Sequence, residues 1–511
     1  MAGIAGCIGH GPAEVHEMLS ALANRGSGSA TVTVHQGITL GCIGTPDTAM
    51  SAWDEYRGVI DGEFYPPEEP QATVETPGAA PTPGSADVAP GEGDVPGGYD
   101  WLHRYALQGP AVLEKVQGVF ALAAVGPDGL WLARDPLGVK PLYYGFDDQG
   151  RLWFASQIKP LLGRVARPRE FPPGHYYGSK AGFRQYYDLP APTGNLQDLD
   201  QAKGTLRRRL QRAIRRRLQG PEEVGVMLSG GLDSSLCAAM AMEAREGEPL
   251  PSFAMGMTGS DDLVQAQAVA RDLGTRHFQR EVQPQEIIAV LPTIIEDLES
   301  FDAAVVRGAV ANHFAAQLAR EHVDAVITGE GADELFAGYH YLKHPRIRER
   351  LEKELQRIVR GGSRTTLQRL DRMSSRHQLM ARLPFLDLDV VNFAWRVPSR
   401  WKLNPREEIE KWILRHVAEA YLSPDIVWRT KAKFALGTGV GPFLAAYAAD
   451  VISPAEYQRE REPLPGLILR DREELLYFRI FRDIFGSRVK DIVPVMGRSP
   501  SLNDEVAGTP V

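Results

Sequence analysis

The amino-acid sequence predicts an α/β protein of two domains, a sheet-rich N-terminal domain followed by a domain built on a parallel sheet. Its 511 residues exceed the size at which one hydrophobic core keeps growing, so two or more domains are expected. Short β-like runs separated by Gly and Asp dominate residues 1–190. From about residue 195, longer helical stretches alternate with buried apolar strands, which indicates a parallel sheet with crossover helices.

The N-terminal domain, residues 1–190, contains β-like runs that alternate with turn residues. These runs lie at 31–34, 119–125, 130–133 and 152–155. Between them, residues 66–98 consist mainly of Pro, Gly, Ala and acidic residues without periodicity. Such a composition cannot bury enough apolar surface to order itself, so we expect a flexible surface insertion there.

The second domain, residues 195–498, shows buried strand-like runs at 225–228, 252–255 and 325–328. An arginine-rich segment at 206–218 has an aliphatic residue at every fourth position, which predicts an amphipathic helix with a solvated basic face. From about residue 384 the pattern is mostly helical. The polar tail at 499–511 is expected to be disordered.

Composition favours a small-molecule enzyme. Lys and Arg total 57 against 65 Asp and Glu, a net charge of −8, which argues against nucleic acid as a partner. Three scattered cysteines, Cys7, Cys42 and Cys237, form neither a disulfide framework nor a thiolate metal cage. No apolar run approaches the ~18 residues of a membrane span, so we expect a cytoplasmic protein without a membrane partner.

The sharpest motif is VMLSGGLDSS at residues 226–235, an apolar strand that runs into a Ser-Gly-Gly turn and a helix predicted over 236–246. Such a turn directs backbone N–H groups and the positive end of a helix dipole at one point, which suits phosphate. The turn has no lysine, so it is not a Walker A loop, and positive charge must come from elsewhere. Asp233 would repel phosphate unless a divalent cation lay between them, which predicts Mg²⁺.

A second strand-to-loop transition, AVITGEGADELFAGY at 325–339, places Glu330, Asp333 and Glu334 just after buried residues. The carboxyl ends of parallel strands line the ligand crevice, so we expect this loop to face residues 226–235. One acid would hold the metal and another would move a proton. The alternative is a glycine-punctuated helix start, where acidic residues are favoured by the helix dipole alone.

Together these loops resemble the asparagine synthetase family, and further motifs follow in the family's order. In the second domain these are DRMSS (371–375), ARLPFLD (381–387), EKWILR (410–415) and WRTKAKF (428–434). In the first domain LARDPLGVKPLYY (132–144) and EFPPGHYY (170–177) are similar to the family's glutaminase domain. The resemblance implies an N-terminal-nucleophile (Ntn) hydrolase-like αββα sandwich and a pyrophosphatase-type, adenine nucleotide α-hydrolase-like ATP-binding domain.

The resemblance also implies an AMP-forming ligase that adenylates a carboxylate with ATP and transfers it to ammonia or an amine. It assigns Mg²⁺ to Asp233 and Asp333, charge stabilisation to Lys431 and the role of base to Glu330. Adenine is expected against the backbone near Met255. The nucleotide-binding residues that it implies are Leu228, Ser229, Gly230, Gly231, Leu232, Asp233, Ser234, Ser235, Met255 and Gly329.

The first domain departs from the family at the glutaminase centre. Family glutaminases begin Met-Cys-Gly-Ile, whereas this sequence begins MAGI, and the methyl group of Ala2 cannot form a thioester. Three further family segments read NRGSG (24–28), IGTP (43–46) and DGE (61–63) here. Cys7 lies inside the chain without an adjacent free amine. We therefore expect a naturally inactive domain, retained for packing, and ammonia rather than glutamine as the nitrogen donor.

The acceptor pocket departs as well. The family's Leu-Glu-Ala-Arg becomes LMAR at 379–382, and a threonine pair before Arg307 becomes Ala304-Val305. These changes remove polar groups, so Arg307 and Met380 are candidate substrate-binding residues, and aspartate or an analogue leads by resemblance only.

The sequence leaves two other functions open. A β-lactam-synthetase-like ligase that uses another amine is favoured by Met380 and Ala304. A non-catalytic pseudoenzyme is disfavoured because Asp233, Glu330 and Lys431 are present. A homodimer is the assembly state considered.

Overall fold

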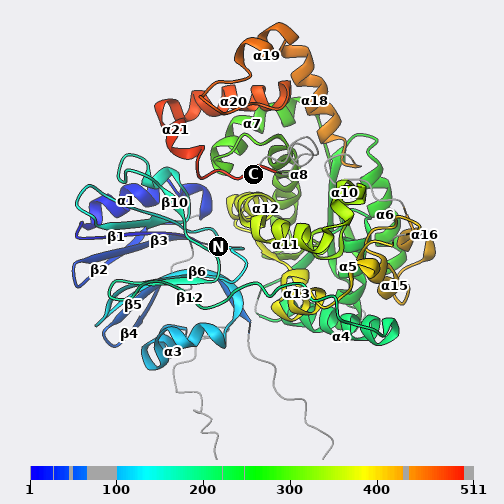
Figure 1. Cartoon of the computed structure of the whole chain (residues 1–511), viewed down its shortest axis with the longest axis horizontal. Coiled ribbons are helices and arrows are strands. Elements are labelled where there is room, and N and C mark those ends of the chain that lie inside the picture. The colour runs from blue at the N-terminus through cyan, green and yellow to red at the C-terminus, as the bar shows by residue number, and fades with distance from the viewer. Residues whose placement is uncertain are drawn as a thin grey trace, which may run out of the picture.

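The first half of the computed structural model is a four-layered αββα sandwich, as predicted (Figure 1). The structure describes residues 2–26, 28–44, 50–65, 101–220, 222–246, 248–404, 406–429 and 437–499. The predicted insertion at 66–98 and residues 500–511 of the predicted tail lie outside it. One antiparallel sheet has the order β10 (Arg169–Glu170), β8 (Tyr143–Phe146), β9 (Leu152–Ala155), β1 (Ala2–Ile8), β3 (Ile38–Gly44), β2 (Thr31–His35). The other has the order β12 (Gly182–Gln185), β11 (His175–Gly178), β7 (Gly129–Arg134), β6 (Gln117–Gly126), β5 (Tyr56–Tyr65), β4 (Met50–Trp53).

A helix covers the side of each sheet that does not meet the other sheet. Helix α1 (Pro12–Ser20) packs on β1 and β3, and α3 (Trp101–Gln108) packs on β4 and β5. In β1, Ala2 and Ile4 lie in the core between the sheets, whereas Ala5 and Cys7 pack with the residues of α1. This alternation has the period of two that a strand imposes, so the small apolar residues of β1 serve two cores.

The second half is built on a five-stranded parallel sheet, also as predicted. Its order is β15 (Arg276–Val282), β14 (Pro251–Met257), β13 (Val224–Met227), β16 (Ala325–Ile327), β17 (Met380–Arg382). Val226 of β13 is level with Ser252 of β14 and with Ile327 of β16. Strands β13 and β16 therefore end side by side, and the loops that follow them leave from the same edge of the sheet.

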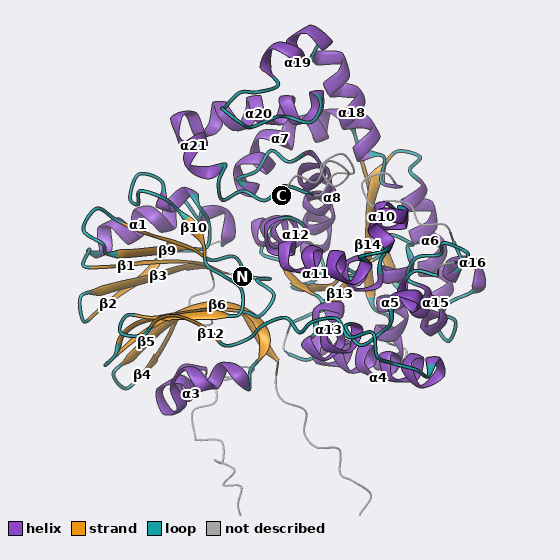
Figure 2. Cartoon of the chain, viewed as in Figure 1, coloured by secondary structure: helices purple, strands orange, loops and turns teal. Residues whose placement is uncertain are grey.

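Helices cover both faces of this sheet (Figure 2). Within β14, Ala254 packs in the cluster that contains α5, while Phe253 packs against Ala316 and Ala319 of α8 on the other face. In chain order the helices are α4 (Leu199–Leu218), α5 (Leu232–Ala244), α6 (Asp261–Leu273), α7 (Pro284–Leu298), α8 (Ala303–Arg320), α9 (Ala332–Phe336), α10 (Pro345–Arg348), α11 (Leu351–Gly361), α12 (Thr366–Arg376), α13 (Leu388–Ala394), α14 (Ser399–Lys402), α15 (Trp412–Ala418), α16 (Pro424–Val427), α18 (Val440–Val451), α19 (Pro454–Glu460), α20 (Arg472–Phe485) and α21 (Val489–Ile492).

The helical region predicted beyond residue 384 is thus present. Short 3₁₀ turns also occur, of which η1 (Ala23–Arg25) and η6 (Pro384–Leu386) matter below. Each helix in the described ranges is too short or too polar to cross a bilayer.

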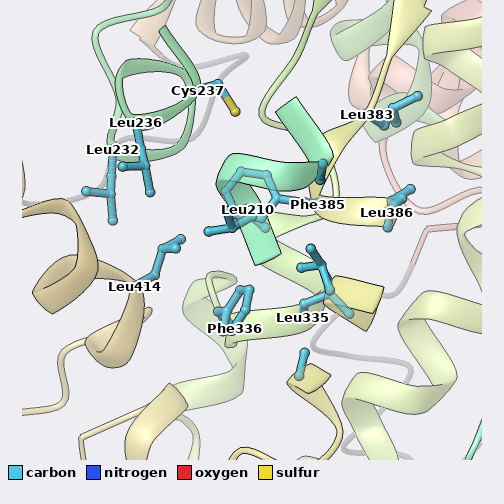
Figure 3. Packing of buried hydrophobic residues seen from close by; sticks show 14 of the residues in the cluster. Leu210, Leu232, Leu236, Cys237, Leu335, Phe336, Leu383, Phe385, Leu386 and Leu414 are labelled. Carbon is cyan, nitrogen blue, oxygen red and sulfur yellow. The ribbon is translucent and has the colours of Figure 1, made fainter. Parts of the chain in front are cut away.

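A hydrophobic cluster lies behind the two loops at the carboxyl edge of the sheet (Figure 3). Leu232 and Leu236 enter it from α5, and Leu335 and Phe336 enter it from α9. Leu210, Phe385, Leu386 and Leu414 enter it from α4, η6 and α15. Because one close-packed cluster holds the first turns of both α5 and α9, the two loops have a set mutual orientation.

The arginine-rich helix α4 differs from its prediction at its C-terminal turn. Leu206, Leu210 and Ile214 are buried as expected, but Arg216 and Arg217 are buried too. Arg217 donates to Asp387 Oδ2 at 2.9 Å, and its guanidinium lies 4.5 Å from the centroid of the Tyr65 ring. The basic face is therefore not wholly solvated, because the first domain covers its end.

Lys402 is a fully buried lysine at the end of α14. Its ammonium lies 4.9 Å from the centroid of the Trp395 ring, and among the described residues Nζ has no hydrogen-bond partner. Burial lowers the pKa of Lys402 to about 7, against a weaker opposing effect of Glu352.

We expect Lys402→Met to stabilise the protein. Between the folded pKa of about 7 and the unfolded pKa of about 10.4, only the unfolded state binds the proton, so stability rises with pH. The gain from Met should be roughly 2 kcal/mol or more at pH 7 and should shrink towards pH 10. Urea unfolding at several pH values measures it. Lys180→Met, at an exposed ion pair with Asp128, is the control, and equal pH slopes for both variants would contradict the assignment.

Candidate active site

The loop between β13 and α5 has the geometry of an anion-binding turn. Helix α5 begins at Leu232 with Gly231 as its N-cap, four residues earlier than predicted. Gly230 has φ +71°, and a Cβ there would lie 2.6 Å from backbone and side-chain carbons of Gln265, so only glycine fits. Ser234 Oγ donates to the Gly231 carbonyl and contacts Ser229 Oγ, both at 3.1 Å. The serine hydroxyls therefore hold the turn in shape.

The loop between β16 and α9 lies against this turn. A Cβ on Gly329 would lie 2.8 Å from Asp233 Cβ and 3.0 Å from the Ser234 nitrogen, so the two loops touch at a glycine. Gly331 has φ +99° and caps α9, which presents Asp333 and Glu334 in its first turn. The predicted approach of the two loops is thus seen in the structure.

A buried lysine, Lys411, joins the two loops. Its ammonium contacts Asp233 Oδ2 and lies 2.5 Å from Asp333 Oδ1. Burial alone would lower the pKa of Lys411, but Asp233 and Asp333 raise it above its ordinary value, so the ammonium stays charged. Sequence reasoning assigned no role to Lys411. The EKWILR motif that contains it, together with the absence of a loop lysine, was the available signal.

The remaining acids of the second loop are also held by neighbours. Arg369 of α12 donates to Glu330 Oε1 at 2.8 Å and to Asn312 Oδ1 at 2.5 Å. The Tyr339 hydroxyl donates to Glu334 Oε1 at 2.6 Å. Burial, together with the nearby carboxylates of Glu330 and Asp333, raises the pKa of Glu334 to about 7. The local sequence pattern predicts neither the contact of Arg369 with Glu330 nor that of Tyr339 with Glu334.

The structure places the other predicted site residues at different parts of the second domain. Met255 lies in β14 at the carboxyl edge of the sheet. It is two residues beyond Phe253, which is level with Met227 at the end of β13. Arg307 is engaged by Glu473 of α20, to which its Nε donates at 2.6 Å. Met380 is level with Ala325 at the amino end of β16, so the structure does not bring it to the acidic loop.

Lys431 lies outside the described residues, but a neighbouring arginine is described. Arg429 Nη1 donates to the Gly230 carbonyl at 3.3 Å, which adds a guanidinium to the phosphate turn. Across the described ranges, three or more His, Cys, Asp or Glu side chains are nowhere gathered as a metal site. A cation at Asp233 and Asp333 would therefore need further ligands from a substrate or from water.

The first domain carries no thiol suited to nucleophilic attack among its described residues. Ala2 stands at the start of β1, and its N–H lies 3.4 Å from Asp61 Oδ1. Burial raises the pKa of the Cys7 thiol to about 12 and that of Cys42 to about 11. Because the thiolate is the nucleophilic form, burial disfavours both thiols as nucleophiles.

Comparison with known proteins gives consistent matches over most of the chain. The asparagine synthase family matches residues 205–365 and 348–488, and a glutamine amidotransferase domain matches residues 99–163. Asparagine synthetase B of Escherichia coli K12 is 33% identical over 408 residues, which cover 75% of this chain and 73% of that protein. Asparagine synthetase 2 of Arabidopsis thaliana is 32% identical over 355 residues, which cover 66% and 61%.

A probable asparagine synthetase of Schizosaccharomyces pombe is 32% identical over 428 residues, which cover 77% of this chain and 76% of that protein. All three relatives are described as glutamine-hydrolyzing. The chain thus spans about three quarters of the bacterial and yeast proteins but less than two thirds of the plant protein.

We expect Lys411→Met to destabilise the protein and to make its stability depend on Mg²⁺. The substitution leaves Asp233 and Asp333 together without a buried cation, a loss of about 3 kcal/mol or more. Added Mg²⁺ should restore part of that loss, because it supplies the missing charge. Thermal unfolding in EDTA and in Mg²⁺ measures the effect. Lys343→Met, which breaks a 2.7 Å contact with Glu410, is the matched control, and an equal Mg²⁺ response in both variants would contradict the site.

Proposed function

Because the chain belongs to the asparagine synthase family, we propose that it is a Mg²⁺-dependent ligase that adenylates a carboxylate with ATP and transfers it to ammonia. The observation that carries this proposal is the contact of the two loops around Lys411. There, a phosphate-binding turn and two carboxylates from separate strand ends converge at one point. ATP-dependent acyl activation needs both features, a phosphate cradle and a cation at the same phosphates.

The phosphate turn would bind the nucleotide through its backbone. Among the described residues, a Cβ added at Gly231 would meet only Ser229 Oγ, at 3.4 Å, so those residues leave space above the turn. The N–H groups of the first turn of α5, which includes Ser234 and Ser235, point their dipole at this space. Adenine is assigned to the edge of the sheet at Met255, because β14 ends next to the turn.

Asp233 and Asp333 suit Mg²⁺ because they already share one cation, the Lys411 ammonium. Two carboxylates do not complete the octahedral shell of Mg²⁺, so phosphate oxygens and waters would supply the rest. When bound, the ion would neutralise phosphate charge. Lys411 would then hold the two loops together whether or not nucleotide is present.

In the first step, an oxygen of the substrate carboxylate bonds to the α-phosphorus, and the bond to pyrophosphate breaks. We assign Lys431 to stabilise the charge that develops there. It follows Arg429 by two residues, and Arg429 contacts the turn itself. In the second step ammonia attacks the acyl carbon and AMP leaves, while Glu330 accepts a proton from the nitrogen. The Glu330 side chain is 22% exposed, so it is open to a substrate.

Ammonia rather than glutamine is proposed as the donor, unlike in the glutamine-hydrolyzing relatives. Ala2 and the buried, high-pKa thiols of Cys7 and Cys42 supply no glutaminase nucleophile. For the acceptor, aspartate or an analogue is proposed by family. A ligase that uses another amine, as in β-lactam synthesis, is the second candidate. The two candidate acceptor-binding residues favour this second candidate. Arg307 is paired with Glu473, and Met380 lies at the amino ends of the parallel strands, away from the acidic loop.

The proposal predicts that a screen of amino-acid carboxylates with Mg²⁺ and ATP will yield AMP and pyrophosphate in equal amounts. Ammonia should support product formation, and glutamine should replace it poorly, with no glutamate release above background. Aspartate and analogues, with ammonia and other amines as separate arms, identify the substrates. ADP and phosphate as the stoichiometric products, or steady glutamate release by pure protein, would refute the proposal.

The division of labour predicts different losses for two variants. Lys431→Ala should abolish both carboxylate-dependent pyrophosphate exchange into ATP and product formation. Glu330→Gln should retain exchange but lose product formation about 10²- to 10⁴-fold, because the base acts only after the adenylate forms. Both reactions are measured on the same preparations. Normal exchange by Lys431→Ala, or product formation by Glu330→Gln at the parent rate, would overturn the assignment.

A further inference from the structure

Helix α12 connects the first domain to the candidate base of the synthetase site. It lies between the N-terminal sandwich and the parallel sheet, and it packs on α7, α8 and η1 (Figure 1). Asp371 on α12 accepts hydrogen bonds from Arg25 Nη1 at 2.7 Å and from Lys140 Nζ at 3.3 Å. The next residue, Arg372, donates to the Ser156 carbonyl at 3.0 Å. Three segments of the first domain thus hold two adjacent residues of one helix.

The contacts around Asp371 join four buried charged side chains, here named the interdomain cluster: Arg25, Asp61, Lys140 and Asp371. Arg25 also donates to Asp61 Oδ2 at 2.6 Å, and Lys140 lies 3.5 Å from Asp61 Oδ1. Each of these side chains is at most 6% exposed, and two positive charges balance two negative ones. Although burial alone would raise it, Arg25 and Lys140 hold the pKa of Asp371 well below its usual range.

The interdomain cluster lies beside Ala2, which stands where family glutaminases have their cysteine. Asp61 contacts the N–H of Ala2, and Arg25 Nε lies 3.3 Å from the Ala2 carbonyl. Arg25 and Asp61 come from two of the segments in which the sequence departs from family glutaminases. Arg25 itself matches the family's arginine, whereas Asp61 replaces its asparagine. In this structure Arg25 contacts Asp371 of the second domain, and Asp61 contacts Arg25.

The same helix holds the candidate base. Arg369 precedes Asp371 by two residues, and its guanidinium bridges Glu330 and Asn312 at 2.8 and 2.5 Å. An α-helix moves as a unit over so short a distance, because its hydrogen-bonded turns are stiffer than the side-chain contacts around it. Any shift of Asp371 is therefore passed to Arg369, and from Arg369 to Glu330.

We propose that the interdomain cluster is a positioning device for the synthetase reaction, which sets α12 through Asp371 and orients Glu330 through Arg369. This inference rests on the proposed role of Glu330. Buried ion pairs are weak contributors to stability relative to apolar residues of the same shape, so packing alone does not require four charges here. The first domain then serves the ligase by alignment, without chemistry of its own.

The test is a double-mutant cycle of Asp371→Asn and Arg369→Gln, with pyrophosphate exchange and amide formation measured per folded enzyme. Asp371→Asn should lower amide formation about 10- to 100-fold while exchange stays within about 3-fold of the parent. In the Arg369→Gln background, Asp371→Asn should add little, because its path to Glu330 is already cut. A proportional fall of both reactions, or additive losses in the double variant, would overturn the proposal.

Two further variants separate positioning from folding. Lys140→Met with Asp371→Asn keeps the interdomain cluster neutral and should fold where Asp371→Asn alone does not, with the same loss of amide formation. Glu63→Gln is the matched control, because it weakens another interdomain ion pair, with Arg382 Nη2 at 2.9 Å, and leaves α12 untouched. It should not change the ratio of the two reactions.

Amide hydrogen exchange tests the positioning without any enzymatic assay. Asp371→Asn, or the neutral double variant, should speed exchange in residues 366–376 and also in 328–336, whereas Glu63→Gln should not. If the parent activates no carboxylate, the proposed function fails. Hydrogen exchange then still tests whether the interdomain cluster positions residues 328–336. If hydrogen exchange in residues 328–336 is unchanged, the positioning role of the interdomain cluster is refuted even if the ligase activity is found.

Discussion

The candidate synthetase site depends on one contact, the Lys411 ammonium between Asp233 and Asp333. Two half-buried carboxylates from separate loops meet there, and burial weakens the screening of their mutual repulsion. Lys411 removes that repulsion and ties the loop after β13 to the loop after β16. Glycines make the approach possible, because Gly329 and Gly338 leave no Cβ at the points where Asp233 and Asp333 pass. The acids of the two loops are therefore already aligned in this structure.

Side chains of strand β5 line the boundary between the two domains. The strand points Asp61, Glu63 and Tyr65 to the same side, since they are two residues apart, and each contacts a basic residue of the second domain or of the interdomain cluster. The contacts of Asp61 and Glu63 are charged and largely buried, so loss of one partner would strand the other at a high cost. The interface is thereby constrained at the level of individual residues.

Much of the architecture was readable from local pattern. The runs at 119–125 and 225–228 became β6 and β13, because period-two alternation and continuous apolar runs report burial directly. The start of α5 was placed four residues late, since Gly231 acts as an N-cap without a side-chain signal. The burial of Arg216 and Arg217 was missed, because helix periodicity describes one helix and says nothing of a second domain laid on its end.

The sequence by itself determined the two sheet types, the phosphate turn, the acidic loop and the absence of a cysteine at position 2, since each is a property of neighbouring residues. Only the tertiary structure decided which cation serves the two loops and what holds Glu330. Lys411 meets Asp233 across 178 positions, and Arg369 meets Glu330 across 39. The tertiary structure also pairs Arg307 with Glu473 and places Met380 at the amino ends of the parallel strands. Local spacing encodes the face of a strand or helix on which a residue lies, whereas the packing of whole elements decides which distant charges become neighbours.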